Sequence, residues 1–161
     1  SYTARFDALA ESDPLTGDPL QRRGNRGVYA LADAHVWSEG GRALDAYIRM
    51  GVAESRFNAV STYAGAGIVL PGPIASRAED QIGLSFASAG AGQDFRRAAD
   101  MAGTPTHSRE TTIELTYRAP LTDWLTIQPD LQYVMHPGFD RSFDDALVIG
   151  LRVEFSASYS R

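Results

Sequence analysis

Apolar and polar side chains alternate along the last part of the chain. In residues 146–155, ALVIGLRVEF, one side of an extended strand would be wholly apolar. That side carries Leu147, Ile149, Leu151, Val153 and Phe155. The opposite side carries Arg152 and Glu154, so the pattern predicts a strand with one apolar face and one polar face.

Two upstream segments repeat this alternation. In residues 110–121 Ile113 and Leu115 oppose Glu114 and Arg118, and in residues 125–136 apolar positions such as Leu131 oppose amides and a carboxylate. Three neighbouring strands would therefore carry their polar groups on one shared face. A water-filled lumen would supply the surroundings that such a face needs.

Eight extended segments separated by turn-forming residues can be recognised. They are residues 2–9, 27–37, 43–53, 57–70, 81–88, 110–121, 125–136 and 146–155. A helical turn is predicted only at FRRAADMA, residues 95–102. Strands of this length suit a half-buried sheet or a transmembrane barrel. We predict an all-β, antiparallel transmembrane β-barrel, with residues 1–161 as a single unit, 146–155 as its last strand and 156–161 as a tail.

The lengths of the connections favour the barrel. If the last strand ends on the periplasmic side, the long connections 10–26, 90–109 and 137–145 fall outside, and the short turn after residue 121 falls inside, as in outer-membrane barrels. The exceptions are the modest connection 53–58 outside and the longer connection 71–80 inside. Aromatic residues near strand ends would suit the two membrane interfaces. These are Trp37, Phe57, Trp124, Tyr133 and Phe155.

Composition excludes several classes of protein. The chain has 161 residues and a net charge of −5, so it lacks the excess of positive charge that is typical of nucleic-acid-binding proteins. It has no cysteine, which excludes disulfides and thiol chemistry. Mean hydropathy is −0.23. This low value leaves a membrane barrel possible, because only alternate residues of its strands face lipid.

The sequence does not predict an enzyme. His35, His107 and His136 could act as bases and Ser108 could be imagined as a nucleophile, but no recognised catalytic or metal-binding spacing accompanies them. We therefore expect no cofactor and no metal site.

The candidate functional residues are the polar ones that would face the lumen. Strict alternation groups Asp33 and His35 with Trp37, and burying Asp33 against hydrocarbon would cost up to about 2–4 kcal/mol, so we place this face inward. The predicted pore-lining, sugar-contacting residues are Asp33, His35, Asp45, Tyr47, Arg49, Glu114, Arg118, Gln128, Asp130, Gln132, Arg152 and Glu154. For any single residue, a salt bridge that stabilises the barrel wall is the alternative role.

Several runs resemble a known family. RGNRGVYALADAHVW, FNAVSTYAGAGIVLPGPIASRAEDQIGLSFA, ETTIELTYRAPLTDWLTIQPDLQYVMHPG and ALVIGLRVEF are similar to the C-terminal portion of the carbohydrate-selective, OprB-type sugar porins. The resemblance implies a channel for passive diffusion of monosaccharides across the outer membrane of a Gram-negative bacterium. It also implies a sixteen-stranded barrel, of which this chain would supply about eight strands.

The resemblance also implies partners. They are small carbohydrates, outer-membrane lipid and lipopolysaccharide, and either a homo-oligomer or the N-terminal half of the same barrel. Two other functions stay open at this point: a small eight-stranded barrel that acts as an anchor or adhesin, and a soluble carbohydrate-binding β-sandwich. We favour a fragment of a longer porin, because eight strands enclose no aqueous bore.

Overall fold

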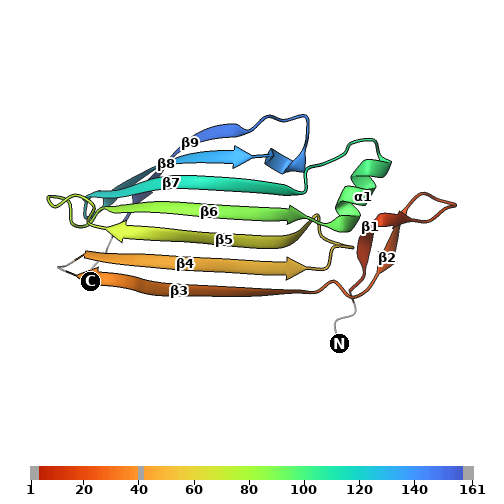
Figure 1. Ribbon diagram of the computed structural model, residues 1–161, viewed down its shortest axis with the longest axis horizontal. Helices are drawn as coiled ribbons and strands as arrows, with labels where there is room; N and C mark the ends of the chain where they lie inside the picture. The colour runs from red at the N-terminus through yellow and green to blue at the C-terminus, as the bar shows by residue number, and fades with distance from the viewer. Residues whose placement is uncertain (1–3, 40–41, 158–161) are drawn as a thin grey trace.

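The main element of the structure is a seven-stranded antiparallel sheet in which each strand pairs with the next one along the chain (Figure 1). The structure is a computed structural model that describes residues 4–39 and 42–157. The strands of the sheet are β3 (Gly27–Glu39), β4 (Arg42–Ala53), β5 (Val60–Pro71), β6 (Gln81–Ala91), β7 (Arg109–Thr122), β8 (Leu125–Met135) and β9 (Ala146–Phe155). The predicted all-β, antiparallel fold is confirmed.

Helical structure is confined to one end of the sheet. The helix α1 (Gln93–Met101) overlaps the predicted helical turn, and η1 (Pro137–Phe139) is a single 3₁₀ turn. Phe139 of η1 is buried and meets Phe95 of α1 edge to face at 6.0 Å. This contact ties the helix to the connection between β8 and β9. Across residues 4–39 and 42–157, no helix has the length and apolar character needed to cross a bilayer.

The first predicted strand lies apart from the main sheet. β1 (Phe6–Ser12) pairs with β2 (Pro19–Arg22), a short strand that the sequence hides within a run of turn-forming residues. The backbone N–H of Leu9 donates to the carbonyl of Arg56 over 2.9 Å, which ties the hairpin to the β4–β5 connection. The hairpin therefore stands at one end of the sheet (Figure 1). Residues 2 and 3 of the predicted segment lie outside the described residues.

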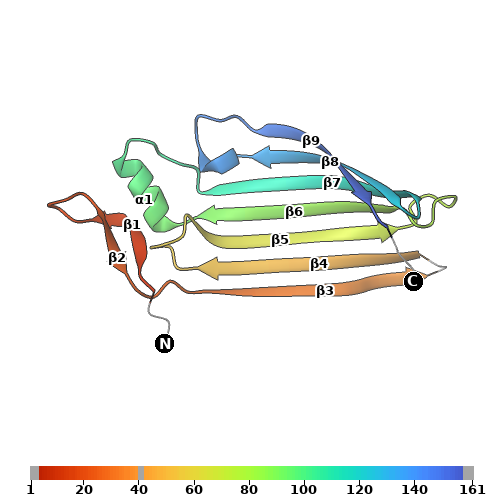
Figure 2. The same cartoon turned by 180° about the vertical axis from the view of Figure 1, so that it is seen from behind.

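The sheet is curved and open. β9 lies behind the other strands in Figure 1 and in front of them in Figure 2, so the sheet curls away from the viewer of Figure 1. Its convex face is the one seen in Figure 1 and its concave face the one seen in Figure 2. β3 and β9 are the two edge strands and do not pair with each other. The described residues therefore form part of a barrel wall.

The wall is one layer thick and has almost no core. Four hydrophobic residues of the described chain are buried, namely Ala8, Ala91, Ala119 and Phe139. The accessible surface is 11321 Å², whereas a compact soluble protein of the same mass would expose about 7,900 Å². A soluble β-sandwich buries one face of each of two sheets against the other. The structure therefore contradicts the sandwich alternative.

The connections sort by end as the sequence predicts. Residues 54–59, 92–108 and 136–145 join strands at the end that carries α1 and the β1–β2 hairpin. Residues 72–80 and the two-residue turn 123–124 join strands at the opposite end. By the usual asymmetry of membrane barrels, we call the first the long-loop end and the second the short-turn end.

Candidate functional site: the concave polar face

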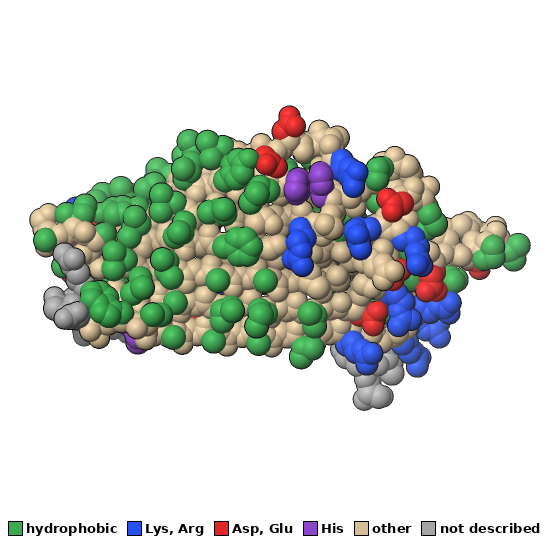
Figure 3. All heavy atoms as spheres, in the orientation of Figure 1, with side chains coloured by type: hydrophobic (Ala, Val, Ile, Leu, Met, Phe, Trp, Pro, Cys, Tyr) green, Lys and Arg blue, Asp and Glu red, His purple; other side chains and the backbone are tan. Residues whose placement is uncertain are grey.

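The register of the strands separates the side chains onto two faces. Ile113 pairs with Phe86 on one side and with Tyr133 on the other, and Leu115 pairs with Leu84 and Leu131 in the next row of that face. Figure 3 shows hydrophobic side chains spread over the convex face, over most of its length. Seven residues predicted to point away from the polar interior lie on it, all exposed: Ile113, Leu115, Leu131, Leu147, Ile149, Leu151 and Val153.

The concave face carries the polar groups. Asp33 pairs with Tyr47, Tyr47 with Gly67, Gly67 with Ser85 and Ser85 with Glu114, so one row crosses the sheet from edge to middle. Because alternate residues of a strand share a face, the register brings together every predicted lumen residue on this side. They are Asp33, His35, Asp45, Tyr47, Arg49, Glu114, Arg118, Gln128, Asp130, Gln132, Arg152 and Glu154.

A first polar cluster joins Asp33, Tyr47 and Arg49 on β3 and β4. Nη2 of Arg49 donates to Oδ1 of Asp33 over 2.7 Å, and Nη1 donates to the carbonyls of Ala32 and Ile48 at 3.1 Å each. The guanidinium carbon also lies 4.9 Å from the centre of the Tyr47 ring. These contacts fix the planar guanidinium against the wall, where its two remaining N–H groups can meet a solute.

Two glycines of β5 make room for tyrosine rings on this face. A Cβ at Gly67 would stand 2.5 Å from Cε1 of Tyr47, and a Cβ at Gly65 would stand 2.7 Å from the hydroxyl oxygen of Tyr63. Each ring therefore lies flat over a glycine. The Tyr47 ring borders a hollow of about 360 Å³ that is also lined by Asp33, His35 and Asp45.

His35 and Asp45 form a second pair beside this hollow. They are register partners on β3 and β4, and Nδ1 of His35 lies against Oδ1 of Asp45. The imidazole is largely exposed, so its other nitrogen faces the concave side freely. The pair adds a donor or acceptor next to the Tyr47 ring.

A second cluster lies across the sheet near the short-turn end. Glu154 of β9 stands between two arginines, with Oε2 3.9 Å from Nη2 of Arg118 and Oε1 4.0 Å from Nη1 of Arg152. All three side chains keep a substantial exposed fraction, so solvent weakens the attraction between them. The cluster is thus a set of accessible charges on the concave face.

Amide side chains extend the second cluster along β8. Nε2 of Gln128 donates to Oγ1 of Thr116 over 3.0 Å, and Nε2 of Gln132 donates to Oδ2 of Asp130 over 3.0 Å. The Asp130 carboxylate leans over Gly150 of β9, where a Cβ would overlap it. Glycine at 150 thus leaves the space that this carboxylate occupies.

Taken together, these side chains offer many weak contacts and no reactive centre. The twelve residues include five carboxylates and three guanidinium groups, with hydroxyl and amide groups between them. The two clusters stand about four strand spacings apart, or about 19 Å along the sheet. Such a surface can exchange hydrogen bonds with a hydrated, uncharged polyol and release it again.

Sequence reasoning missed some members of this face and misplaced one. Gln81 and Thr116 belong to it, and the alternation of QIGLSF with its apolar Ile82 would have revealed Gln81. Trp37 does not belong to it, because a bulge between His35 and Trp37 shifts the register and pairs Trp37 with Leu44 of the convex face. One extra residue in a strand reverses every face assignment beyond it.

At the short-turn end, a buried carboxylate links the β5–β6 turn to β7. Asp80 is 1% exposed, and it accepts hydrogen bonds from Nε and Nη2 of Arg77 at 2.5 and 2.9 Å and from the hydroxyl of Tyr117. The Arg77 guanidinium holds the pKa of Asp80 below its usual value, and this outweighs the opposing effect of desolvation. These bonds fasten the β5–β6 turn to β7.

The convex face is not apolar over its whole length (Figure 3). Charged side chains gather at the long-loop end of the convex face, beyond the apolar region. A curved, one-layered antiparallel wall that is apolar outside and polar inside is the wall of a membrane-spanning β-barrel. The class of protein is therefore a membrane β-barrel.

Comparison with known proteins assigns the family. Residues 2–156 match the family described as "Carbohydrate-selective porin, OprB family", and the chain belongs to this family. It is 30% identical over 165 residues to Porin B of Pseudomonas aeruginosa, a match that covers 92% of this chain and 36% of Porin B.

A solved structure agrees with this assignment. It is described as "High pH structure of Pseudomonas putida OprB", and it matches with a TM-score of 0.82 at 26% identity. The match covers 95% of this chain and 42% of that one. The chain thus spans about two fifths or less of the length of these relatives.

Proposed function

We propose that this chain is part of a porin that lets small carbohydrates, monosaccharides above all, diffuse passively across the outer membrane of a Gram-negative bacterium. The observation that carries the proposal is the division of the sheet into an apolar convex face and a polar concave face. The family name supports carbohydrate as the solute. The channel changes no bond, so we propose no catalytic step and no enzyme activity.

The rest of the barrel must come from further strands. An edge strand in hydrocarbon would leave unpaired N–H and C=O groups, and each such group costs several kcal/mol. β3 and β9 therefore need partners. We propose that the chain is the C-terminal part of a larger barrel, residues 1–161 forming one unit of it, and that an N-terminal half of the same polypeptide closes the wall. Outer-membrane lipid and lipopolysaccharide would cover the convex face, and a homo-oligomer is an alternative neighbour.

The twelve residues of the concave face are our candidates for the pore lining. The Tyr47 ring offers a flat surface for the C–H groups of a sugar ring, and the Arg49 guanidinium and Asp33 carboxylate beside it offer a donor and an acceptor for hydroxyls. Each contact replaces one with water, so binding stays weak and release stays fast. The second cluster around Glu154 would repeat such contacts across the pore.

Liposome swelling tests this function directly. The native polypeptide that contains these residues is reconstituted and exposed to sugars of increasing size. We expect monosaccharides to enter much faster than trisaccharides, and the variant Asp33→Asn with Arg49→Gln to slow monosaccharide entry. Arg141→Gln, in the β8–β9 connection, is the control and should leave the rate unchanged. Swelling no faster than in empty liposomes would overturn the proposal.

A further inference from the structure

An arginine-lined hollow opens on the convex face at the long-loop end. It has a volume of about 710 Å³, and Arg26, Arg96 and Arg109 line it together with hydroxyl side chains. Its floor is a single cross-strand row that runs from Val28 through Val52, Thr62 and Gly90 to Arg109. Arg109 shares its strand face with Ile113, so this row belongs to the apolar convex side and not to the pore.

The three arginines come from separate segments that backbone bonds hold together. Arg26 precedes β3, and its carbonyl accepts from the N–H of Glu54 over 2.9 Å. Arg96 lies in α1, and the N–H of Gly92 at the start of this helix donates to the carbonyl of Ala59 over 2.7 Å. The N–H of Ala91 donates to the carbonyl of Ser108, next to Arg109, over 3.0 Å. Backbone hydrogen bonds therefore fix the positions of the segments that line the hollow.

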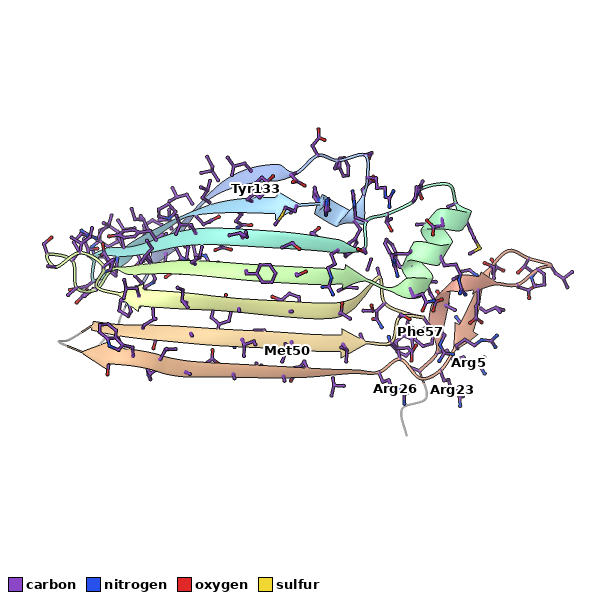
Figure 4. All side chains as sticks on the ribbon, viewed as in Figure 1. Arg5, Arg23, Arg26, Met50, Phe57 and Tyr133 are labelled. Carbon is purple, nitrogen blue, oxygen red and sulfur yellow. The ribbon has the colours of Figure 1, made fainter. Side chains whose placement is uncertain are left out.

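The charges in the hollow are unbalanced. In the part of the chain that the structure describes, no carboxylate lies within 4.0 Å of Arg26, Arg96 or Arg109. Glu54 also lines the hollow, but its carboxylate is paired with Arg56 at 3.5 Å. Three guanidinium groups thus remain available for an anion. Figure 4 shows further arginines at this end, among them Arg5 and Arg23 beside the β1–β2 hairpin.

One of these guanidinium groups is positioned by a buried hydroxyl. Ser88 is 5% exposed, and its Oγ accepts from Nη1 of Arg109 over 3.3 Å while it shares a hydrogen bond with Thr111 Oγ1 at 3.2 Å. Gly90 leaves the adjoining floor open, because a Cβ there would collide with Oγ1 of Thr62. A guanidinium held in this way presents its free N–H groups in the planar fork that binds phosphate.

We propose that this hollow binds a phosphate group of a phosphorylated glycolipid of the outer leaflet, such as lipopolysaccharide. The inference rests on the proposed membrane-barrel function, which places the long-loop end at the outer surface of the membrane. The hollow joins its arginines to the exposed Val28 and Val52, which share a row with Arg109. Further exposed apolar side chains, such as Met50 and Ile113, follow on the same face toward the short-turn end, and an anionic lipid has the same order of phosphate head and acyl chain. A soluble phosphate would use the arginines but not the valines.

The test measures glycolipid binding to the native polypeptide that contains this chain, purified in detergent and stripped of lipid. The probes are purified lipopolysaccharide, the same material after enzymatic dephosphorylation, and inorganic phosphate. The site variant is Arg26→Gln, Arg96→Gln and Arg109→Gln together. The control is Arg5→Gln, Arg23→Gln and Arg141→Gln, which makes the same change in charge elsewhere at the long-loop end.

We expect the site variant to bind lipopolysaccharide at least about tenfold more weakly than the native protein, because each lost pairing is charge-assisted. The control should keep most of its affinity, dephosphorylated material should bind both variants equally weakly, and inorganic phosphate should not compete at equal concentration. Equal binding by the native protein and the site variant would overturn the inference, as would an equal loss in the control.

Conductance measured on the same preparations separates this inference from the proposed function. A site variant that conducts normally and has lost the glycolipid supports both. A protein that conducts but binds glycolipid without need of the three arginines refutes the inference alone. A protein that binds glycolipid through these arginines but never conducts refutes the proposed function alone.

Discussion

The ring of Tyr47 lies on Gly67, so close that a Cβ at position 67 would stand 2.5 Å from Cε1 of the ring. This relationship puts the aromatic ring flat on the concave wall and beside the Arg49 guanidinium. The glycine thus determines where the flat surface of the proposed sugar path lies.

We predict that Gly67→Ala pushes the Tyr47 ring off the wall and weakens block of the ion current by monosaccharides. The loss of one contact worth about 1 kcal/mol would raise the blocking concentration about fivefold. Gly51→Ala is the matched control. Gly51 lies on the same strand as Tyr47, and a Cβ at position 51 would have no neighbouring atom nearer than 3.8 Å. Equal block in both variants would show that the ring does not contact sugar.

The charges of the concave face should set the ion preference of the pore. Replacing Arg49, Arg118 and Arg152 together by Ala removes all three guanidinium groups of the twelve candidates and leaves their five carboxylates unopposed by arginine. We expect a reversal potential shifted toward cations and a changed sugar flux, with insertion into the outer membrane unaffected. Planar bilayers under a salt gradient give the measurement. If reversal potential and flux both stay at their native values, these arginines serve only the wall.

The buried Asp80 should matter for stability and not for transport. Asp80→Asn weakens the bidentate bonds from Arg77 and should lower the melting temperature of the barrel by several degrees. Glu79→Gln, one residue away and exposed, is the control. The lowered pKa of Asp80 means that its contribution is complete above about pH 4 and is lost as pH falls through the folded value. The native protein should therefore lose its excess stability over Asp80→Asn only as pH falls well below the ordinary carboxyl range.

The stacked pair His107 and His136 should make the long-loop end sensitive to acid. Their rings lie 3.9 Å apart, and the pKa of His107 is lowered by burial first, then by His136 and Arg141, against the raising effect of Asp145. A lowered pKa means that the stacked arrangement is favoured above pH 6.5 and is lost progressively as pH falls below it. Proteolysis of residues 136–145 should be faster at pH 5 than at pH 7.5. His107→Gln should remove most of this difference.

The isolated chain should not conduct. Both edges of its sheet are open, and hydrocarbon does not tolerate unpaired strand edges. We expect purified residues 1–161 to form no stable sugar-permeable channel in planar bilayers, and conduction to return when the missing strands are supplied in cis or as a partner. A defined, sugar-blockable conductance from the 161 residues alone would indicate instead that copies of this chain join into one barrel.

Much of this architecture could be predicted from alternation alone. In β7, β8 and β9 the period of two is unbroken over the central residues, so the faces of Glu114, Asp130 and Arg152 follow directly from the sequence. The same rule failed at Trp37, because a bulge depends on pairing with another strand and leaves no mark in the pattern of one. The β1–β2 hairpin was missed for a similar reason, since a four-residue strand has too few positions to show a period.

The parts of the site that could not be predicted depend on contacts between distant residues. Nothing near Asp80 in the sequence indicates that Tyr117 will donate to it, and nothing near Arg26 indicates that Arg96 and Arg109 will share its hollow. Local pattern gives the face of a side chain. Only the register and the folded turns give its neighbours.

The near-absence of a core has a consequence for how this sequence can change over generations. Fluid lipid does not require the matched shapes that a packed interior requires. Exchanges among Leu, Ile and Val at positions such as Ile149 should therefore change the stability of the protein very little. On the concave wall, Gly67 and Gly150 each hold space that a neighbouring side chain fills. Within the family, the outer surface should therefore drift while these small inner positions stay fixed.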